Sequence, residues 1–171
     1  LETMRYNNFN NKLNIVVIRS QFNSDIVSNL YLGVEKCFED RKIQINPIEQ
    51  IEVPGAFELP YMTQQVLNKN FKDEHSNILV NPDCIITLGC VIKGETAHFE
   101  YISNACANTL SQLTINNCGV PIMFGVITAY TREQALKRSE VNFDNQENLN
   151  IGYNVTNAAI ETLLSLEKHS L

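Results

Sequence analysis

Residues 89 to 96 are the part of the sequence in which residue types and spacing point most directly to chemistry. They read Gly-Cys-Val-Ile-Lys-Gly-Glu-Thr and differ at one position from the phosphate-binding loop G-x-x-x-x-G-K-[ST]. Glu95 stands where that loop has Lys, and its carboxylate would repel a triphosphate. Gly94 and the amides of the helix predicted to follow still suit a single phosphate. These residues favour a small phosphorylated ligand, although a glycine turn with Thr96 as a helix cap explains them about equally well.

His98 follows this loop and lies in the first turn of the predicted helix. An imidazole titrates near neutral pH, so a histidine beside a bound anion is a candidate for proton transfer. A histidine taken alone is more often a packing or surface residue. Only the neighbouring loop favours the catalytic interpretation.

Four further residues are candidates for ligand binding. Phe22, Phe57 and Phe124 each lie at or near the end of a predicted strand, where a ring can stack on a flat heterocycle, although core packing is the simpler explanation. Arg138 lies on a short predicted helix, and its guanidinium suits phosphate, although a solvated surface arginine is the more common case. The sequence contains no metal-ligand cluster, dinucleotide fingerprint or serine-nucleophile motif.

The elements that must position these residues alternate between strand and helix. Apolar runs predict strands at residues 13–18, 43–53, 84–92 and 120–129, and helical spacing predicts helices at about 26–38, 57–70, 96–116, 132–139 and 155–166. Residues 71–82 and 140–150 are polar and predicted to be loops. Strands that are apolar on both faces imply a parallel sheet covered on both sides, with ligands at the carboxyl ends of the strands. The predicted fold is a three-layer α/β/α sandwich, flavodoxin-like, with a four-stranded parallel sheet.

Length and composition restrict the class of protein. The 171 residues suit one domain, which we expect to span residues 1–171 with residues 1–12 as a flexible N-terminal arm. A net charge of -6 without a basic stripe argues against nucleic acid, and the apolar runs are too short to span a membrane. Five cysteines without a C-x-x-C pair indicate a reducing compartment. We therefore expect a cytoplasmic protein, or a plastid one if a transit segment has been removed.

Five segments, in order, resemble the lumazine synthase family, and the likeness covers residues 13 to 166. They are Phe-Asn at residues 22–23, Val-Pro-Gly-Ala-Phe-Glu at 53–58, Gly-Glu-Thr-Ala-His-Phe-Glu-Tyr at 94–101, Pro-Ile-Met-Phe-Gly-Val-Ile-Thr at 121–128 and Glu-Gln-Ala-Leu-Lys-Arg at 133–138. The resemblance implies a transferase of riboflavin biosynthesis that requires no cofactor and no metal. The reaction would join 5-amino-6-(D-ribitylamino)uracil to 3,4-dihydroxy-2-butanone 4-phosphate, giving 6,7-dimethyl-8-ribityllumazine.

The resemblance also implies roles for individual residues. Phe22 and Asn23 would contact the pyrimidine, the ribityl chain would lie against Ala56, Phe57 and Glu58, and the backbone of Cys90, Val91 and Ile92 would bind the ring edge. Gly94, Glu95 and Thr96 would face the phosphate, a site that phosphate or sulfate ion would also fill, and His98 would transfer protons. Phe124 and Arg138 would come from a neighbouring subunit of a homopentamer.

Three departures from the family pattern bear on these roles. Gln21 stands where the family usually has Arg, and Ile151 and Asn154 stand where it has Lys and Asp near the last helix. The loop at residues 140–148 is longer and more acidic than usual, which favours free pentamers over shells of twelve pentamers. The alternatives are a weakly active or non-catalytic homologue that binds flavin-like ligands, a structural assembly protein, and an FMN carrier of the flavodoxin type. The last lacks its expected phosphate loop after the first strand.

Overall fold

The computed structural model describes residues 9, 11–68, 71–72, 79–117, 119–143 and 148–169. Its centre is a sheet of four parallel strands, β1 (Ile15–Ser20), β2 (Glu49–Val53), β5 (Cys84–Ile92) and β6 (Ile122–Ala129). The strands lie in the order β2-β1-β5-β6, so each crossover returns the chain to the same end of the sheet. This arrangement confirms the predicted flavodoxin-like sheet.

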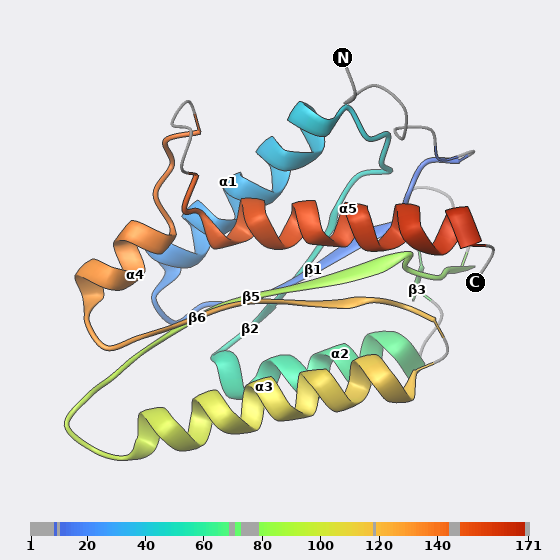
Figure 1. The fold of residues 1–171 in the computed structure, drawn as a ribbon. Helices are drawn as coiled ribbons and strands as arrows, with labels where there is room; N and C mark the ends of the chain where they lie inside the picture. Colours follow the sequence, from blue (N-terminus) through green and yellow to red (C-terminus); the bar gives the residue numbers. More distant parts are fainter. Residues whose placement is uncertain are drawn as a thin grey trace.

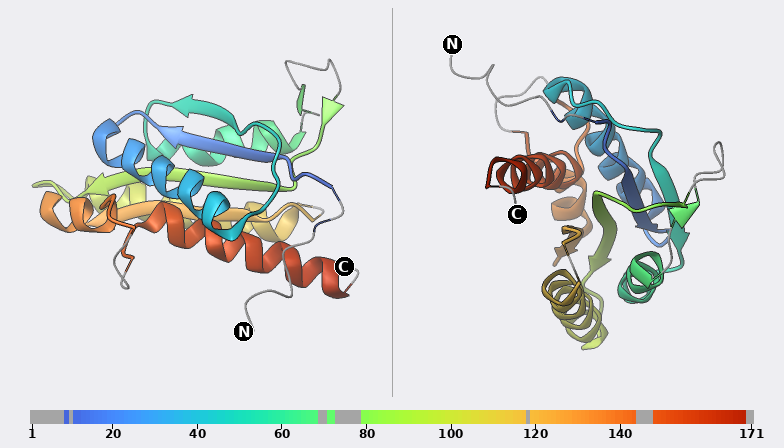
Figure 2. Two further views of the ribbon diagram at one scale, coloured as in Figure 1. Left: turned by 90° about the horizontal axis from the view of Figure 1, so that it is seen from above. Right: turned by 90° about the vertical axis from the view of Figure 1, so that its right-hand side faces the viewer.

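Helices cover both faces of the sheet. Figures 1 and 2 show α1 (Ser24–Arg41) and α5 (Ile151–His169) on one face and α2 (Leu59–Asn68) and α3 (His98–Asn116) on the other. A short α4 (Arg132–Arg138) follows β6, and a 3₁₀ turn, η1 (Ala56–Glu58), precedes α2. Alternate residues of β1 enter the two cores: Val17 packs on the α1 and α5 side, whereas Val16 and Ile18 pack on the α2 and α3 side.

The α1 and α5 helices approach closely because two glycines and a buried asparagine lie between them. A Cβ on Gly152 would be 1.9 Å from the backbone oxygen of Leu30, and one on Gly33 would be 2.1 Å from Oδ1 of Asn150. The Asn150 side chain is fully buried, donates to the carbonyls of Asn29 and Glu140, and accepts from the N–H of Tyr153. Asn150 therefore ties the start of α5 to α1.

Several predicted boundaries were wrong. The second predicted strand, residues 43–53, is a strand only from Glu49, because the apolar residues Ile43, Ile45 and Ile48 pack against the α1-side core instead, with one isolated bridge between Ile45 and Leu13. The last helix begins at Ile151 rather than 155, since Asn150 holds its first turn.

The structure describes one of the two predicted long loops more fully than the other. The loop at residues 71–82 contains a two-stranded antiparallel pair, β3 (Phe71–Lys72) with β4 (Leu79–Val80). Most of the predicted arm at residues 1–12, and residues 144–147 of the long acidic loop, lie outside the described residues. No helix in the described part of the chain is long and apolar enough to cross a membrane.

The central strand β5 extends beyond its neighbour β1, and this offset creates room for a site. The β1–β5 pairing ends with Arg19 opposite Leu88, whereas β5 continues to Ile92 beside β6. On the β1 side, no described strand pairs with residues 89 to 92. Backbone groups at this end of β5 are therefore open to other partners.

Candidate active site

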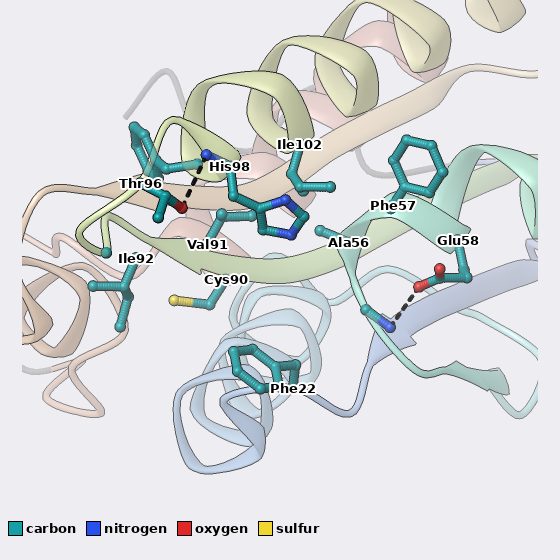
Figure 3. Close-up of a pocket in the computed structure, with 13 residues that line it drawn as sticks. Phe22, Ala56, Phe57, Glu58, Cys90, Val91, Ile92, Thr96, His98 and Ile102 are labelled. Carbon is teal, nitrogen blue, oxygen red and sulfur yellow. Dashed lines mark hydrogen bonds between the residues drawn. The ribbon is translucent and has the colours of Figure 1, made fainter.

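A pocket of about 650 Å³ lies at the carboxyl ends of β1 and β5, between η1 and the start of α3 (Figure 3). Three connections supply its lining residues: the turn from β1 to α1, the turn from β2 to α2 and the loop from β5 to α3. Its lining residues are Phe22, Gly55, Ala56, Phe57, Glu58, Cys90, Val91, Ile92, Gly94, Thr96, His98, Phe99 and Ile102. This is the position at which parallel α/β sheets bind ligands.

The β1–α1 turn presents an aromatic ring at the pocket. The backbone N–H groups of Gln21 and Phe22 donate to the carbonyls of Val53 and Pro54 at 2.8 and 3.1 Å, and so continue the pairing of β1 with β2. The Phe22 side chain is 71% exposed, which leaves its face free for stacking. Asn23 follows in the left-handed region at φ 56°, which asparagine tolerates better than most residues.

The side chain of Asn23 binds the open end of β5. Its amide donates to the carbonyl oxygen of Cys90 at 3.0 Å. The Lys93 N–H donates to the Ala129 carbonyl, so Val91 and Lys93 direct their backbone groups toward β6. By alternation, Cys90 and Ile92 direct theirs toward the pocket side. The backbone N–H and C=O of Ile92 therefore provide one donor and one acceptor that can hydrogen-bond to the edge of a heterocyclic ring.

The turn after β2 is held by Glu58. Its Oε2 accepts from the backbone N–H of Gly55 at 2.8 Å, a bond that Figure 3 also shows, and the backbone N–H of Glu58 donates to the Gly55 carbonyl at 3.3 Å. This contact leaves the second carboxylate oxygen free for a ligand hydroxyl. Ala56 is buried in the wall, whereas Phe57 is 58% exposed at the mouth.

The loop after β5 leads into α3 without a strong side-chain cap. The helix begins at His98, two residues later than predicted, and its N-cap residue Ala97 has no capping side chain. The Oγ1 of Thr96 accepts from the His98 N–H at 3.5 Å, which is long for such a bond, so the predicted capping role of Thr96 is weak. The first N–H groups of α3 therefore stay available to an anion.

Few ionisable groups line the pocket. The His98 imidazole points from α3 toward the wall that Ala56 and Phe57 form (Figure 3). Burial raises the pKa of the Cys90 thiol to about 11, with Arg132 opposing the shift, so the thiol stays protonated at neutral pH. No lining residue in the described part of the chain is Lys or Arg. The described residues also contain no group of acidic, His or Cys side chains that could hold a metal ion.

Comparison with known proteins decides the family. The family model for 6,7-dimethyl-8-ribityllumazine synthase matches residues 12–167. The chain belongs to the lumazine synthase family. A relative of that name from Leuconostoc mesenteroides subsp. mesenteroides is 38% identical over 125 residues, which is 73% of each chain.

The fold places ten of the fourteen site residues predicted for a lumazine synthase around this one pocket. Asn23 lies beside it through its bond to Cys90, and Glu95 is exposed and outside the lining. Phe124, 40% exposed on the edge strand β6, and Arg138, exposed on α4, do not line this pocket.

Three lining residues were missed by sequence reasoning. Ile102 lies four residues after His98, on the same face of α3, and this spacing was the signal that could have identified it. Gly55 and Phe99 adjoin predicted site residues in the family segments, but their types carry no chemistry of their own.

The residues that depart from the lumazine synthase pattern have structural partners here. Ile151 packs against the core that lies between the sheet and helices α1 and α5. The side-chain amide of Asn154 donates to the Asn148 carbonyl at 3.2 Å. Gln21 donates from its side chain to Glu52. None of the three lines the pocket.

Proposed function

We propose that the chain condenses 5-amino-6-(D-ribitylamino)uracil with 3,4-dihydroxy-2-butanone 4-phosphate in the pocket at the end of β5. The observation that carries this assignment is the convergence of a stacking ring, a free backbone edge and an uncapped helix start on one cavity of about 650 Å³. These features match a flat heterocycle at one end and a phosphate at the other.

The pyrimidine would stack on Phe22 and hydrogen-bond to the backbone of β5 at Ile92. This orientation directs its ribityl chain toward η1, where the free oxygen of Glu58 can accept from a hydroxyl. Ring stacking of this kind contributes about 0.5 to 1.5 kcal/mol beyond buried area. A change at Phe22 should therefore alter binding of the pyrimidine more than binding of the second substrate.

The phosphate would lie at Gly94 and Thr96, in front of the first N–H groups of α3. A Cβ at Gly94 would meet nothing within 4 Å, so this loop leaves open space for a ligand. His98 then lies between the phosphate end and the heterocycle end of the pocket. In that position its imidazole can carry protons during imine formation between the 5-amino group and the ketone, elimination of phosphate, and ring closure with loss of water.

Positioning supplies most of the rate enhancement in this proposal. Holding two reactants in register accounts for about 7 to 11 kcal/mol of barrier reduction, whereas acid-base help adds roughly 10²-fold or more. A pocket with one imidazole suits such a reaction. No cofactor or metal enters the proposal.

We further propose that a neighbouring subunit of a homopentamer completes the pocket. The described lining has no cation for a phosphate, while Arg138 lies elsewhere, exposed, with no ion-pair partner among the described residues. Phe124 is a large apolar side chain left 40% exposed on an edge strand. Both would enter the site of the adjacent subunit, and the acidic loop that begins at Glu140 favours free pentamers.

We infer a cytoplasmic enzyme from Cys37, Cys84, Cys90 and Cys106, which are buried free thiols. We also propose that residues 1–171 form a single lumazine-synthase-like domain.

A two-substrate fluorescence assay tests the function. Purified protein mixed with both substrates should produce the fluorescence of the lumazine product at a rate that saturates in each substrate. If the protein binds riboflavin or lumazine tightly but makes no product, the non-catalytic alternative is correct and the assignment fails.

Mixed assemblies test the shared site. Gly94→Asp places a negative charge at the phosphate end of one subunit's pocket, and Arg138→Ala removes the cation that a neighbour supplies. Each variant alone should be nearly inactive at low keto-phosphate. Equal parts refolded together should recover roughly one intact site in four, because about one neighbouring pair in four combines an unchanged Gly94 loop with an unchanged Arg138. Absence of any recovery in assembled mixtures would contradict the shared site.

A further inference from the structure

We propose that Gln21 is a positioning residue that fixes the Phe22 ring through a hydrogen bond to Glu52 and thereby sets the affinity for the heterocyclic substrate. The inference rests on the proposed function, because it assigns a task to a residue next to the stacking ring. Gln21 itself lies outside the pocket lining.

The geometry centres on the carboxylate of Glu52, on the edge strand β2. Its Oε2 accepts from Nε2 of Gln21 at 3.1 Å, and its Oε1 accepts from Nη2 and Nε of Arg19 at 2.7 and 3.1 Å. Both oxygens of one carboxylate are thus used, one by the last part of β1 and one by the turn that follows. The hydrogen bond from Gln21, followed by those from Arg19, lowers the pKa of Glu52, which stays ionised as an acceptor.

This cluster is anchored to a helix as well as to the sheet. The Arg19 guanidinium lies 5.5 Å from the ring centroid of Tyr31 on α1. The Arg19 side chain is 25% exposed and that of Glu52 47% exposed, so the pair is partly sheltered on the arginine side. The contacts therefore run from α1 through β1 and β2 to the residue before Phe22.

Phe22 depends on its neighbours because its own side chain makes few contacts. With 71% of it exposed, packing cannot hold the ring in one orientation. The chain is instead held on both sides of the ring: Asn23 binds β5 through Cys90, and Gln21 binds β2 through Glu52. These two side-chain bonds add to the backbone bonds from Gln21 and Phe22 to Val53 and Pro54, and together they fix the backbone from which the ring projects.

Residue chemistry at position 21 makes the inference testable by substitution. Gln21→Ala removes the donor, whereas Gln21→Arg keeps a donor for Glu52 and so should preserve the function. Gln50→Ala is the matched control, since Gln50 is an exposed glutamine on β2, the edge strand that also carries Glu52. Steady-state kinetics with each substrate varied in turn, together with thermal denaturation, gives the readout.

Gln21→Ala should raise the KM for the pyrimidine about three- to tenfold, the range for loss of one hydrogen bond, and leave the KM for the keto-phosphate and the Tm nearly unchanged. Gln21→Arg and Gln50→Ala should resemble the unchanged protein. Equal rises in both KM values, or the same rise in the control, would overturn the inference.

A double-mutant cycle with Phe22→Ala separates positioning from a general structural role. If Gln21 acts through the ring, Gln21→Ala should have no further effect on the pyrimidine KM once the ring is removed, and none in a Glu52→Leu protein. Additive effects in both backgrounds would contradict the inference. The unchanged protein reports separately on the proposed function: if it makes no lumazine, that function fails, whereas an active protein with an unaltered Gln21→Ala variant refutes only the positioning role.

Discussion

Replacement of Asn23 tests how the turn beneath the pocket is held. Asn23 combines a left-handed backbone, at φ 56° and ψ 46°, with a side-chain bond of 3.0 Å to the Cys90 carbonyl. Asn23→Gly removes the bond but suits the backbone, whereas Asn23→Ala removes the bond and leaves a Cβ in a region that L-residues avoid. The two variants therefore separate the hydrogen bond from the conformation.

The expected magnitudes follow from these two contributions. Loss of the bond costs about 1 kcal/mol of unfolding free energy in either variant. Alanine adds about 1 to 2 kcal/mol of left-handed strain, and glycine adds about 0.5 to 1 kcal/mol through its freer unfolded chain. We expect Asn23→Gly to lose about 1.5 to 2 kcal/mol and Asn23→Ala about 2 to 3 kcal/mol.

Urea denaturation measures the stability, and steady-state kinetics measures the function. Both variants should raise the KM for the pyrimidine, because the freed Cys90 carbonyl and the loosened turn disturb the heterocycle end of the pocket. If Asn23→Ala were as stable as Asn23→Gly, the left-handed assignment would be wrong. If neither variant altered the pyrimidine KM, the bond to Cys90 would have no role in the site.

Three other predictions concern packing, pH and catalysis. Gly152→Ala should cost about 3 kcal/mol or more in urea denaturation, because its Cβ would be 1.9 Å from a backbone oxygen that cannot rotate away, whereas Gly94→Ala should change stability by no more than about 0.5 kcal/mol. Burial raises the pKa values of the Cys90 and Cys106 thiols from 9.0 to about 11 and those of Cys37 and Cys84 to about 12, so the stability that these protonated thiols contribute is full below pH 9 and is lost as the pH rises above 9, which denaturation at pH 8 and pH 10 should show as a lower stability at pH 10. His98→Ala should lower kcat by roughly 10²-fold without abolishing turnover in stopped assays, and complete inactivity of the folded variant would show that positioning carries less of the rate than proposed.

The fold was largely predictable because hydrophobic pattern determines it. The central strand at Cys84–Ile92 was predicted with its observed bounds, since a strand buried on both faces must be a continuous apolar run. Apolar residues that pack without pairing, such as Ile45, carry the same signal as a strand, and this made the second strand too long. The early start of α5 depends on tertiary bonds of Asn150, which no local pattern reveals.

The site was predictable where several family segments converge and less so elsewhere. Strand ends were expected to meet at one edge, and Phe22, Glu58 and His98, far apart in sequence, do line one pocket. The roles given to Phe124 and Arg138 depend on a second subunit, which the sequence of one chain cannot position. Gln21 was noted only as a departure, because its partner Glu52 lies on another strand.

The most direct test of the central claim compares the unchanged protein with Gly94→Asp in one reaction. Lumazine formation and inorganic phosphate release are measured together, with thermal denaturation as the check on folding. Because a Cβ at Gly94 would meet nothing within 4 Å, the variant should fold normally while its carboxylate repels the phosphate. We predict equal amounts of lumazine and phosphate from the unchanged protein and a steep rise in the keto-phosphate KM for the variant. Failure of the unchanged protein to form lumazine, or normal kinetics in Gly94→Asp, would contradict catalysis in this pocket.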